Sequence, residues 1–325
     1  MKRLGIVVNP MSGRDVRRVA ARASTSSHHE KQQQVTRLVL GAFSQGVEEI
    51  FLANEPYRIN SRAVENLQQR DRVRILDIPL THTAADTKTM VQRMWQEGCR
   101  VFIVLGGDGT NRTVASSFPD AVILPLSTGT NNVFSTFVEA SIAGAAAGLI
   151  ASGQMQYRDH CRRCKQIHIS LADVSETALI DAVLLKNDIL GSLLPFEANN
   201  IVSALLTRAN PASIGVSPIG GYLLPCQHDD EFAVFLQCGE IGRSITIPIS
   251  SGLYDDVHVS QIEKVALGNP ITIDGPGILA FDGDRTIKLG NRETARLEVR
   301  RDGPWVIETT EVMNSAARSG LFETS

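Results

Sequence analysis

The chain has 325 residues, of which 43% are hydrophobic and 21% charged, and its formal net charge is −3. This length and composition fit a globular protein of two domains, and the small net charge excludes a general attraction to nucleic acid or to an anionic membrane surface. The five cysteines are odd in number without disulfide-scaffold spacing, and no apolar run approaches the roughly 18 residues of a membrane-spanning helix, so we expect a cytoplasmic protein.

The first 150 residues alternate short apolar runs with longer segments of helical pattern. This alternation is typical of βαβ units and predicts a Rossmann-like, parallel-sheet nucleotide-binding domain at 1–150. The stretch 24–34 is polar, and we expect a loop there. The expected strands are 4–8, 49–53, 74–78, 101–105 and 121–124, and the expected helices are 32–44, 84–97, 111–117 and 141–151.

From about residue 165 the sequence changes to closely spaced runs rich in Ile, Val and Leu, with turn signals between them. Strands without long helices between them favour an antiparallel, β-sandwich-like domain, which we place at 151–305. The apolar stretch 201–206 leaves room for one inserted helix, and the tail at 306–325 is expected to form a helix that packs back onto the body. The expected strands are 166–171, 178–185, 231–236, 244–249, 271–273, 277–281 and 294–299.

The segment Asn9-Pro10-Met11-Ser12-Gly13 follows the first expected strand. It places side-chain oxygens and amides at the carboxyl edge of the sheet, where open α/β folds bind ligands. We therefore expect contacts to phosphate from Asn9, Ser12 and Gly13. The alternative is an ordinary Asn-Pro turn that leads into a loop.

A glycine-rich turn follows the apolar run 101–105 and consists of Gly106, Gly107, Asp108, Gly109 and Thr110. Glycines let backbone N–H groups approach phosphate oxygens without interference from a Cβ atom, and their φ freedom allows the concave backbone that binds anions. The turn therefore predicts phosphate binding, with the Asp108 carboxylate at its centre. The alternative is a strand-to-helix turn in which the glycines serve only the geometry of the backbone.

A run of small and amide residues follows the next expected strand and supplies donors beside the glycine turn. Adjacent strands would bring both loops to one crevice, where these hydroxyl and amide groups suit a ribose, an adenine edge or phosphate oxygens. The alternative is the N-cap of a short helix, a role that is compatible with phosphate binding. The predicted nucleotide contacts in this run are Thr128, Gly129, Thr130, Asn131 and Asn132.

These segments resemble the superfamily of NAD kinases and diacylglycerol or sphingosine kinases, whose shared motif is the Gly-Gly-Asp-Gly-Thr turn found here at 106–110. Within it, they resemble in particular the ATP-NAD kinase-like group that includes the acetoin-catabolism protein AcoX. The resemblance implies an α/β nucleotide domain and a β-rich domain, with the site in the cleft between them and ATP as a ligand. It also rests on 9–10, 83–87, 127–134, 139–144 and 281–284.

The resemblance assigns chemical roles to three carboxylates. In NAD kinases the Asp of the glycine turn takes the proton from the attacking hydroxyl, which implies that role for Asp108. Further carboxylates would anchor Mg²⁺, in part through water. The segment 281–284 matches the Asp-Gly-Glu motif of the lipid kinases and implies metal ligands at Asp282 and Asp284. The alternative is a hairpin turn, for which Asp-Gly is a strong signal.

An acidic residue, Asp181, interrupts the apolar strand expected at 178–185. An unpaired buried charge is costly, so this carboxylate calls for an explanation, of which an edge position or a bend is the simplest. The segment is similar to the NAD kinase strand whose Asn-Glu pair holds the dinucleotide and which reads Ile180-Asp181 here. The resemblance thus implies a substrate contact at Asp181, with NAD as one candidate ligand.

Motifs and resemblance together favour an ATP-dependent kinase that phosphorylates a hydroxyl of a small molecule, with NAD as one candidate acceptor. Two alternatives stay open: a diacylglycerol-type lipid kinase, and a catalytically silent regulatory protein that binds a dinucleotide. The expected partners are a nucleotide and a hydroxyl acceptor, with no nucleic acid and no membrane span. Related proteins imply a homo-oligomer.

Overall fold

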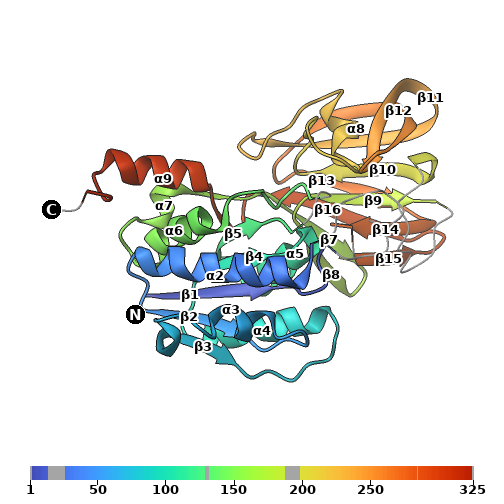
Figure 1. Ribbon diagram of the computed structural model, residues 1–325. Coiled ribbons are helices and arrows are strands. Elements are labelled where there is room, and N and C mark those ends of the chain that lie inside the picture. The colour runs from blue at the N-terminus through green and yellow to red at the C-terminus, as the bar shows by residue number, and fades with distance from the viewer. Residues whose placement is uncertain (1, 14–25, 129–131, 187–197, 284, 324–325) are drawn as a thin grey trace.

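The structure is a computed structural model that describes residues 2–13, 26–128, 132–186, 198–283 and 285–323. Two bodies lie side by side (Figure 1). One contains the N-terminus and is built on a mostly parallel sheet between helices, and the other consists of antiparallel sheets. The predicted combination of an α/β half and an all-β half is confirmed.

A mostly parallel sheet of seven strands forms the centre of the N-terminal body. Its strands are β1 (Arg3–Val8), β2 (Glu49–Ala53), β3 (Val73–Leu76), β4 (Val101–Leu105), β5 (Val122–Leu126), β6 (Cys161–Arg163) and β17 (Trp305–Ile307), and their order is β3-β2-β1-β4-β5-β17-β6. Every residue of β4 and β5 is buried. This continuous burial is expected of parallel strands whose two faces are both covered by helices.

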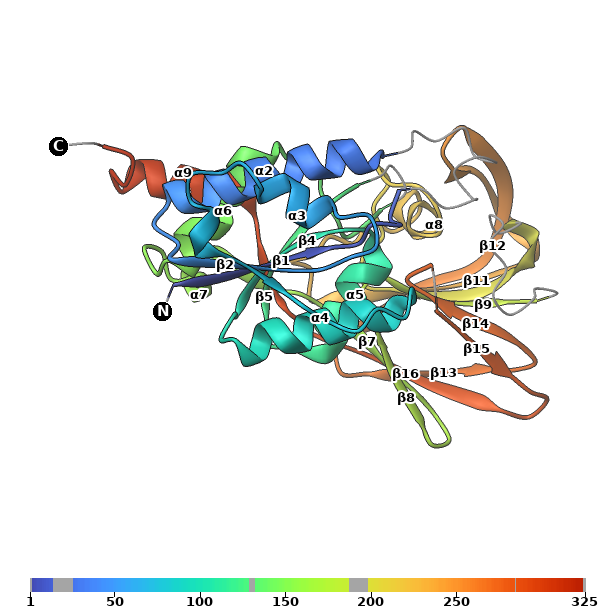
Figure 2. The same cartoon turned by 60° about the horizontal axis from the view of Figure 1, so that its bottom comes forward.

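Among the described residues, the helices that cover this sheet are α2 (His28–Ser44), α3 (Ile59–Val64), α4 (Ala84–Gln96), α5 (Asp108–Ser117) and α6 (Ala140–Ala151). Helices α2, α3 and α6 pack on one face, and α4 and α5 pack on the other (Figure 2). Loops at the carboxyl ends of β1, β4 and β5 therefore meet at one edge of the sheet.

Helix α2 begins earlier than expected, because His28 already lies in its first turn. The prediction of a loop over 24–34 is therefore wrong from His28 onward, and residues 24 and 25 lie outside the described residues. Ser27 and Glu30 form a capping box, in which the Ser27 side chain accepts from the Glu30 N–H and the Glu30 side chain accepts from the Ser27 N–H. The Ser-x-x-Glu pattern is a signature of a helix start, and polar composition alone does not reveal it.

Helices α2 and α6 approach closely at glycines. A Cβ atom at Gly144 would overlap the carbonyl oxygen of Leu38, and one at Gly41 would overlap that of Ser141. We expect Gly144→Ala to lower the free energy of unfolding by about 2 kcal/mol, since the helices must separate to admit the methyl group. Urea unfolding measures this loss. The matched control is Gly239→Ala, where the nearest atom would lie 3.8 Å away; equal stability of the two variants would contradict the close approach.

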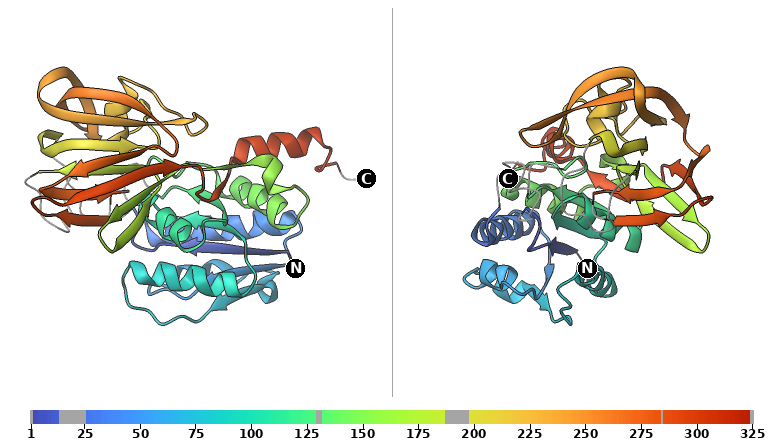
Figure 3. Two further views of the ribbon diagram at one scale, coloured as in Figure 1. Left: turned by 180° about the vertical axis from the view of Figure 1, so that it is seen from behind. Right: turned by 90° about the vertical axis from the view of Figure 1, so that its right-hand side faces the viewer.

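The chain returns to the first sheet after the second body. Strand β17 pairs in parallel with β5 and antiparallel with β6, so the sheet takes strands from both sides of the all-β half. The crossing segments are also joined, since Cys164 N–H donates to Pro304 O at 3.0 Å and Gly303 N–H donates to Cys164 O at 3.1 Å. Helix α9 (Thr309–Arg318) then packs against α6 and α7 (Tyr157–His160), as the views in Figure 3 show.

The second body consists of a six-stranded and a four-stranded antiparallel sheet. The first contains β9 (Asp181–Leu185), β10 (Ile201–Leu206), β11 (Phe232–Ser250), β12 (Leu253–Ala266), β14 (Gly277–Phe281) and β15 (Arg285–Leu289), and the second contains β7 (Gln166–Leu171), β8 (Val174–Ala178), β13 (Pro270–Asp274) and β16 (Thr294–Arg300). A shared core of apolar side chains, including Leu184, Leu279 and Leu297, joins the sheets. The short helix α8 (Ser217–Gly221) packs beside β11.

Residues 201–206 form the strand β10 and not the expected inserted helix. The strand pairs with β9 on one side and β11 on the other, so most of its residues are buried and the alternation that marks a half-exposed strand is missing. Among the described residues, no helix has the length and apolar character that a membrane crossing requires.

Candidate functional site

The glycine turn is the N-terminus of helix α5. Gly107 is the N-cap in an extended conformation and provides no side-chain cap. A Cβ atom at Gly106 would lie 2.7 Å from the Thr110 side chain, so this position requires glycine. In the described part of the chain, no acceptor takes the N–H groups of Gly107, Asp108 and Gly109. Unpaired N–H groups at a helix start, together with the helix dipole, favour an anion.

Asp108 is partly buried beside these amides. Its carboxylate accepts from the N–H groups of Val133 at 2.8 Å, Phe134 at 3.1 Å and Ser135 at 3.3 Å. Burial raises the pKa of Asp108 above its ordinary value, and the three N–H donors and the positive charge of Arg208 offset only part of that effect. The three hydrogen bonds from the loop after β5 fix the orientation of this carboxylate.

The loop after β1 packs against the glycine turn through Asn9. The Asn9 Nδ2 donates to the Thr110 hydroxyl at 2.9 Å, and its Oδ1 accepts from the N–H groups of Met11 and Ser12. The predicted neighbours Asn9, Ser12 and Thr110 are thus brought together. Because one Asn side chain both shapes its own loop and contacts the next, the positions of the two loops are coupled.

A fully buried lysine, Lys31 of α2, forms hydrogen bonds with the same loop. Its Nζ donates to the carbonyl oxygens of Asn9 at 3.0 Å, Pro10 at 2.7 Å and Ser12 at 2.6 Å. The sequence analysis missed this residue. A signal was available, since Lys31 falls four residues before Val35 on the buried face of the helix, where an apolar residue is expected.

The loop after β5 completes the site. Thr128 donates to the Ser12 hydroxyl at 2.7 Å, and Asn132 Nδ2 donates to the Ser127 hydroxyl at 2.8 Å. A Cβ atom at Gly107 would lie 3.1 Å from Asn132 Oδ1, so the amide side chain borders the glycine turn. Gly13 has a φ of +75°, which favours glycine. The other predicted contacts in this loop, Gly129, Thr130 and Asn131, lie outside the described residues.

Asp181, the first residue of β9, brings the second body to this site. Its Oδ1 accepts from the Asp282 N–H at 3.2 Å. Burial and, after it, the negative charge of Asp108 raise the pKa of Asp181 to about 7. The two carboxylates, one from each body, are therefore close enough to influence each other's protonation.

Asp282 is committed to contacts inside the protein. Its side chain has no exposed surface, and its two oxygens accept from the N–H groups of Leu179 and Ile180, each at 2.8 Å. Arg112 Nε lies 3.7 Å from Asp282 Oδ2. Burial and the charge of Asp181 raise the pKa of Asp282 well above its ordinary value.

The predicted metal ligands are Asp282 and Asp284. Asp282 and Gly283 lie in the turn between β14 and β15, as in the alternative that the Asp-Gly signal offered. Asp284 lies outside the described residues, and in the rest of the chain no group of three or more His, Cys, Asp or Glu side chains could hold a metal ion. The metal assignment stays a prediction.

Arg208, which follows β10, is a second residue that the sequence analysis missed. Its guanidinium lies over the Phe134 ring at 4.9 Å from the ring centroid, and its positive charge lowers the pKa of Asp108. No local pattern in the sequence marks this residue, because only the packing of the two bodies places it beside the glycine turn.

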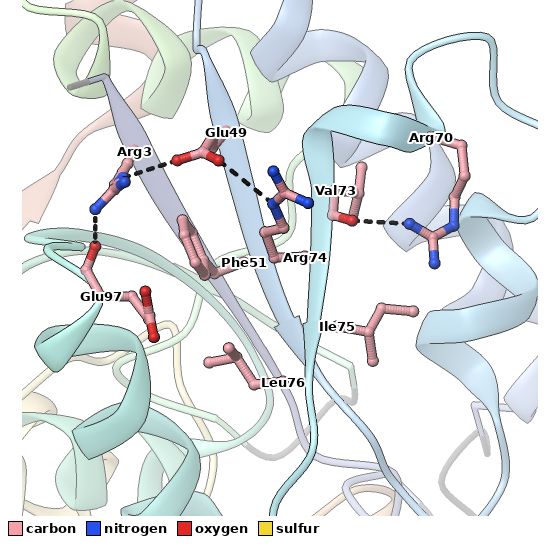
Figure 4. A pocket seen from close by; sticks show the side chains of 9 residues that line it. All are labelled: Arg3, Glu49, Phe51, Arg70, Val73, Arg74, Ile75, Leu76 and Glu97. Carbon is pink, nitrogen blue, oxygen red and sulfur yellow. Dashed lines mark hydrogen bonds and ion pairs between the residues drawn. The ribbon is translucent and has the colours of Figure 1, made fainter.

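A separate pocket of about 450 Å³ lies at the amino ends of β1, β2 and β3 (Figure 4). Its arginines are already engaged with acceptors: Glu49 pairs with Arg3 at 2.9 Å and Arg74 at 3.4 Å, and Arg70 donates to the Val73 carbonyl. The glycine turn lies at the carboxyl ends of the strands, so this pocket does not belong to the candidate site.

Comparison with known proteins gives two family matches that follow each other along the chain. Residues 4–155 match the ATP-NAD kinase N-terminal domain, and residues 165–302 match the acetoin catabolism protein X C-terminal domain. Acetoin catabolism protein X of Cupriavidus necator is 29% identical over 335 aligned positions, which cover 98% of this chain and 93% of that protein.

A solved structure shares the fold of this chain. A Bacillus anthracis protein assigned as a diacylglycerol kinase aligns with a TM-score of 0.50 at 13% identity, over 94% of this chain and 97% of that chain. An NAD kinase from Archaeoglobus fulgidus in complex with ATP aligns with a TM-score of 0.42 at 11% identity, over 82% of this chain and 96% of that chain. The first of these supports the two-part architecture described above.

Proposed function

Because the chain belongs to the NAD kinase-like superfamily, with an ATP-NAD kinase N-terminal domain followed by an acetoin catabolism protein X C-terminal domain, we propose that it is an ATP-dependent phosphotransferase. It moves the terminal phosphoryl group of ATP to a hydroxyl group of a small molecule, and NAD is the first acceptor to test. The nucleotide and the acceptor meet where the two bodies adjoin, between Asp108 and Asp181.

One observation carries this proposal: the start of α5 offers the N–H groups of Gly107, Asp108 and Gly109 without acceptors in the described chain, directly beside a fixed carboxylate. Backbone amides at a helix start suit phosphate oxygens, and a carboxylate beside them suits the proton of an attacking hydroxyl.

The neighbouring side chains fit the same chemistry. Ser12, Thr110 and Asn132 supply hydroxyl and amide groups around the turn. In the proposal, Gly13, Gly106, Thr128 and the segment 129–131 shape or extend this nucleotide contact. Asp108 takes the proton of the acceptor hydroxyl, and Asp181 contacts the acceptor.

Mg²⁺ is the metal that ATP chemistry commonly requires. The described residues do not fit a preformed metal site, because they contain no group of three or more metal-ligating side chains and because Asp282 is sealed by backbone donors. We therefore assign no step to a protein-held metal.

An assay of ADP release with Mg²⁺, ATP and a panel of acceptors tests the proposed function. We expect ADP release that depends on the acceptor, with NAD, small diols and dispersed diacylglycerol compared in parallel. A product that enters organic solvent would point to the lipid kinase alternative. Thermal stabilisation by NAD without any ADP release would point to the regulatory alternative. The absence of both ADP release and ATP-induced stabilisation would contradict the proposal.

Arg208 supplies a positive charge that acts on Asp108 in this site. We expect Arg208→Gln to lower kcat about 100-fold, since preorganised charge stabilises the transferring phosphoryl group. The measurement is kcat from ADP release at saturating ATP. Arg243→Gln, at an exposed position on β11, is the matched control. A kcat for Arg208→Gln equal to that of the control would remove Arg208 from the chemistry.

A further inference from the structure

The pocket at the amino ends of β1, β2 and β3 has a charged rim and an apolar floor. Its volume of about 450 Å³ lies within the roughly 300–1,000 Å³ of small-molecule sites. Three positive and two negative side chains line it, so the lining has an excess of positive charge. The charged residues are Arg3, Arg70, Arg74, Glu49 and Glu97, and the apolar ones are Phe51, Val73, Ile75 and Leu76.

The pocket lies at the open side of the sheet, because β3 is an edge strand. On β3, Arg74 and Leu76 share one face, and the parallel register places Arg74 beside Phe51 of β2. Arg70 covers the start of the edge, since its Nη1 donates to the Val73 carbonyl and the Val73 N–H donates to the Arg70 carbonyl. A four-residue strand whose first residue is occupied in this way is a poor template for an added strand. The pocket therefore suits a small molecule better than an extended peptide.

Two of the arginines keep N–H donors that the protein does not use. Arg74 Nε lies 3.4 Å from Glu49 Oε1, and Arg70 Nη1 lies 2.8 Å from the Val73 carbonyl oxygen. In the part of the chain that the structure describes, no acceptor takes Nη1 or Nη2 of Arg74, or Nε or Nη2 of Arg70. Both arginines are exposed. Planar guanidinium groups with open donors match the oxygens of a carboxylate or a phosphate.

The opposite side of the pocket is negative. Figure 4 shows Arg70 and Glu97 at opposite sides, with Phe51 and Leu76 between them. Arg3 donates to the backbone carbonyl of Glu97, and among the described residues no cation is paired with the Glu97 carboxylate. An anionic group is therefore attracted at the side of Arg70, and a second anionic group is repelled at the side of Glu97.

We propose that this pocket binds a small organic molecule with one anionic head group, a carboxylate or a phosphate, and an uncharged apolar body. The head group accepts from the open donors of Arg70 and Arg74. The apolar body lies on Phe51 and Leu76, which form the floor between the two sides. Glu97 selects against molecules that carry an anionic group at each end.

This pocket is separate from the glycine turn. Strand β1 runs from Arg3 at the pocket to Val8, which precedes the loop of the candidate site, and its six residues span about 20 Å. A molecule in the pocket leaves the start of α5 free. Failure of the phosphotransferase assay would therefore leave this ligand site untouched, and absence of the ligand site would leave the proposed function untouched.

Benzoate and phenyl phosphate are the two probes, because they place a carboxylate or a phosphate on the same apolar ring. We expect the tighter probe to bind with a Kd of about 1 mM and to shift the Nε–Hε NMR signals of Arg70 and Arg74. Arg74→Gln should weaken this binding about tenfold, because it removes charge-assisted hydrogen bonds. The variant should fold, since Glu49 keeps its contact with Arg3. Arg93→Gln, at an exposed position on α4, is the matched control.

A second variant tests the negative side of the pocket. Terephthalate carries a carboxylate at each end of the ring, and we expect it to bind the parent protein about tenfold more weakly than benzoate. Glu97→Gln should remove most of this difference. Terephthalate binding as tight as that of benzoate in the parent protein would contradict the role of Glu97.

Two results would overturn the site as a whole. One is the absence of any shift in the Arg70 and Arg74 signals with both probes. The other is equal probe affinity of Arg74→Gln and Arg93→Gln. In either case the arginines are solvated charges that only protect the edge of the sheet.

Discussion

Asp108→Asn is expected to lower kcat for phosphoryl transfer about 1,000-fold, the largest loss of activity of any substitution considered. The substitution removes the carboxylate that is proposed to take the proton of the acceptor hydroxyl. It also turns an acceptor-only group into one with an NH₂ group, although three backbone N–H groups point at this position. The loop at 133–135 must then shift. The loss of the carboxylate is measured as kcat from ADP release, and the effect of the loop shift on ATP affinity is measured by calorimetry.

The control for this experiment is Asp173→Asn, at an exposed position between β7 and β8. Asp108→Asn should retain binding of ATP, because the free N–H groups at the start of α5 belong to the backbone. Turnover within about threefold of the control would remove Asp108 from the mechanism.

Lys31→Met is expected to give the largest loss of stability, about 3 kcal/mol in the free energy of unfolding. The side chain is fully buried, and its Nζ donates to three carbonyl groups of the loop after β1. Methionine has a similar shape without the donors, so the carbonyl groups of Asn9, Pro10 and Ser12 lose a partner away from water. Urea unfolding gives the magnitude.

The same substitution should weaken ATP binding, because the loop that Lys31 holds also carries the Asn9 contact to Thr110 in the glycine turn. Lys88→Met is the matched control, since Lys88 is an exposed lysine on α4. If both lysine variants unfold at the same urea concentration, the three carbonyl contacts of Lys31 contribute nothing to stability.

Fold prediction from the sequence succeeded where burial gives a simple pattern. All five strands expected in the first half coincide with structural strands to within about two residues at each end, because parallel strands covered on both faces read as short apolar runs. The same burial made 201–206 ambiguous, since a fully buried strand and a buried helical turn share an apolar pattern at that length. The start of α2 was missed because polar residues at a helix N-terminus resemble a loop.

The site was predictable to the extent that its chemistry lies in contiguous motifs. Gly107, Asp108 and Thr110 lie in one motif, and the contact of Thr110 with Asn9 followed from the shared edge of parallel strands. Lys31 and Arg208 act through contacts that tertiary packing creates, and no spacing rule connects them to the turn. Cytoplasmic location and a homo-oligomer stay predictions, and the domain limits at 150 and 305 stay predictions as well.

The placement of β17 between β5 and β6 limits how this protein can be divided. A fragment that stops at residue 155, where the first family match ends, would lack the strand that covers β5 and would expose an unpaired sheet edge that invites aggregation. Exchange of the all-β half between relatives consequently requires two junctions, near 164 and 303, and recombination at a single site would separate the nucleotide-binding half from a strand of its own sheet.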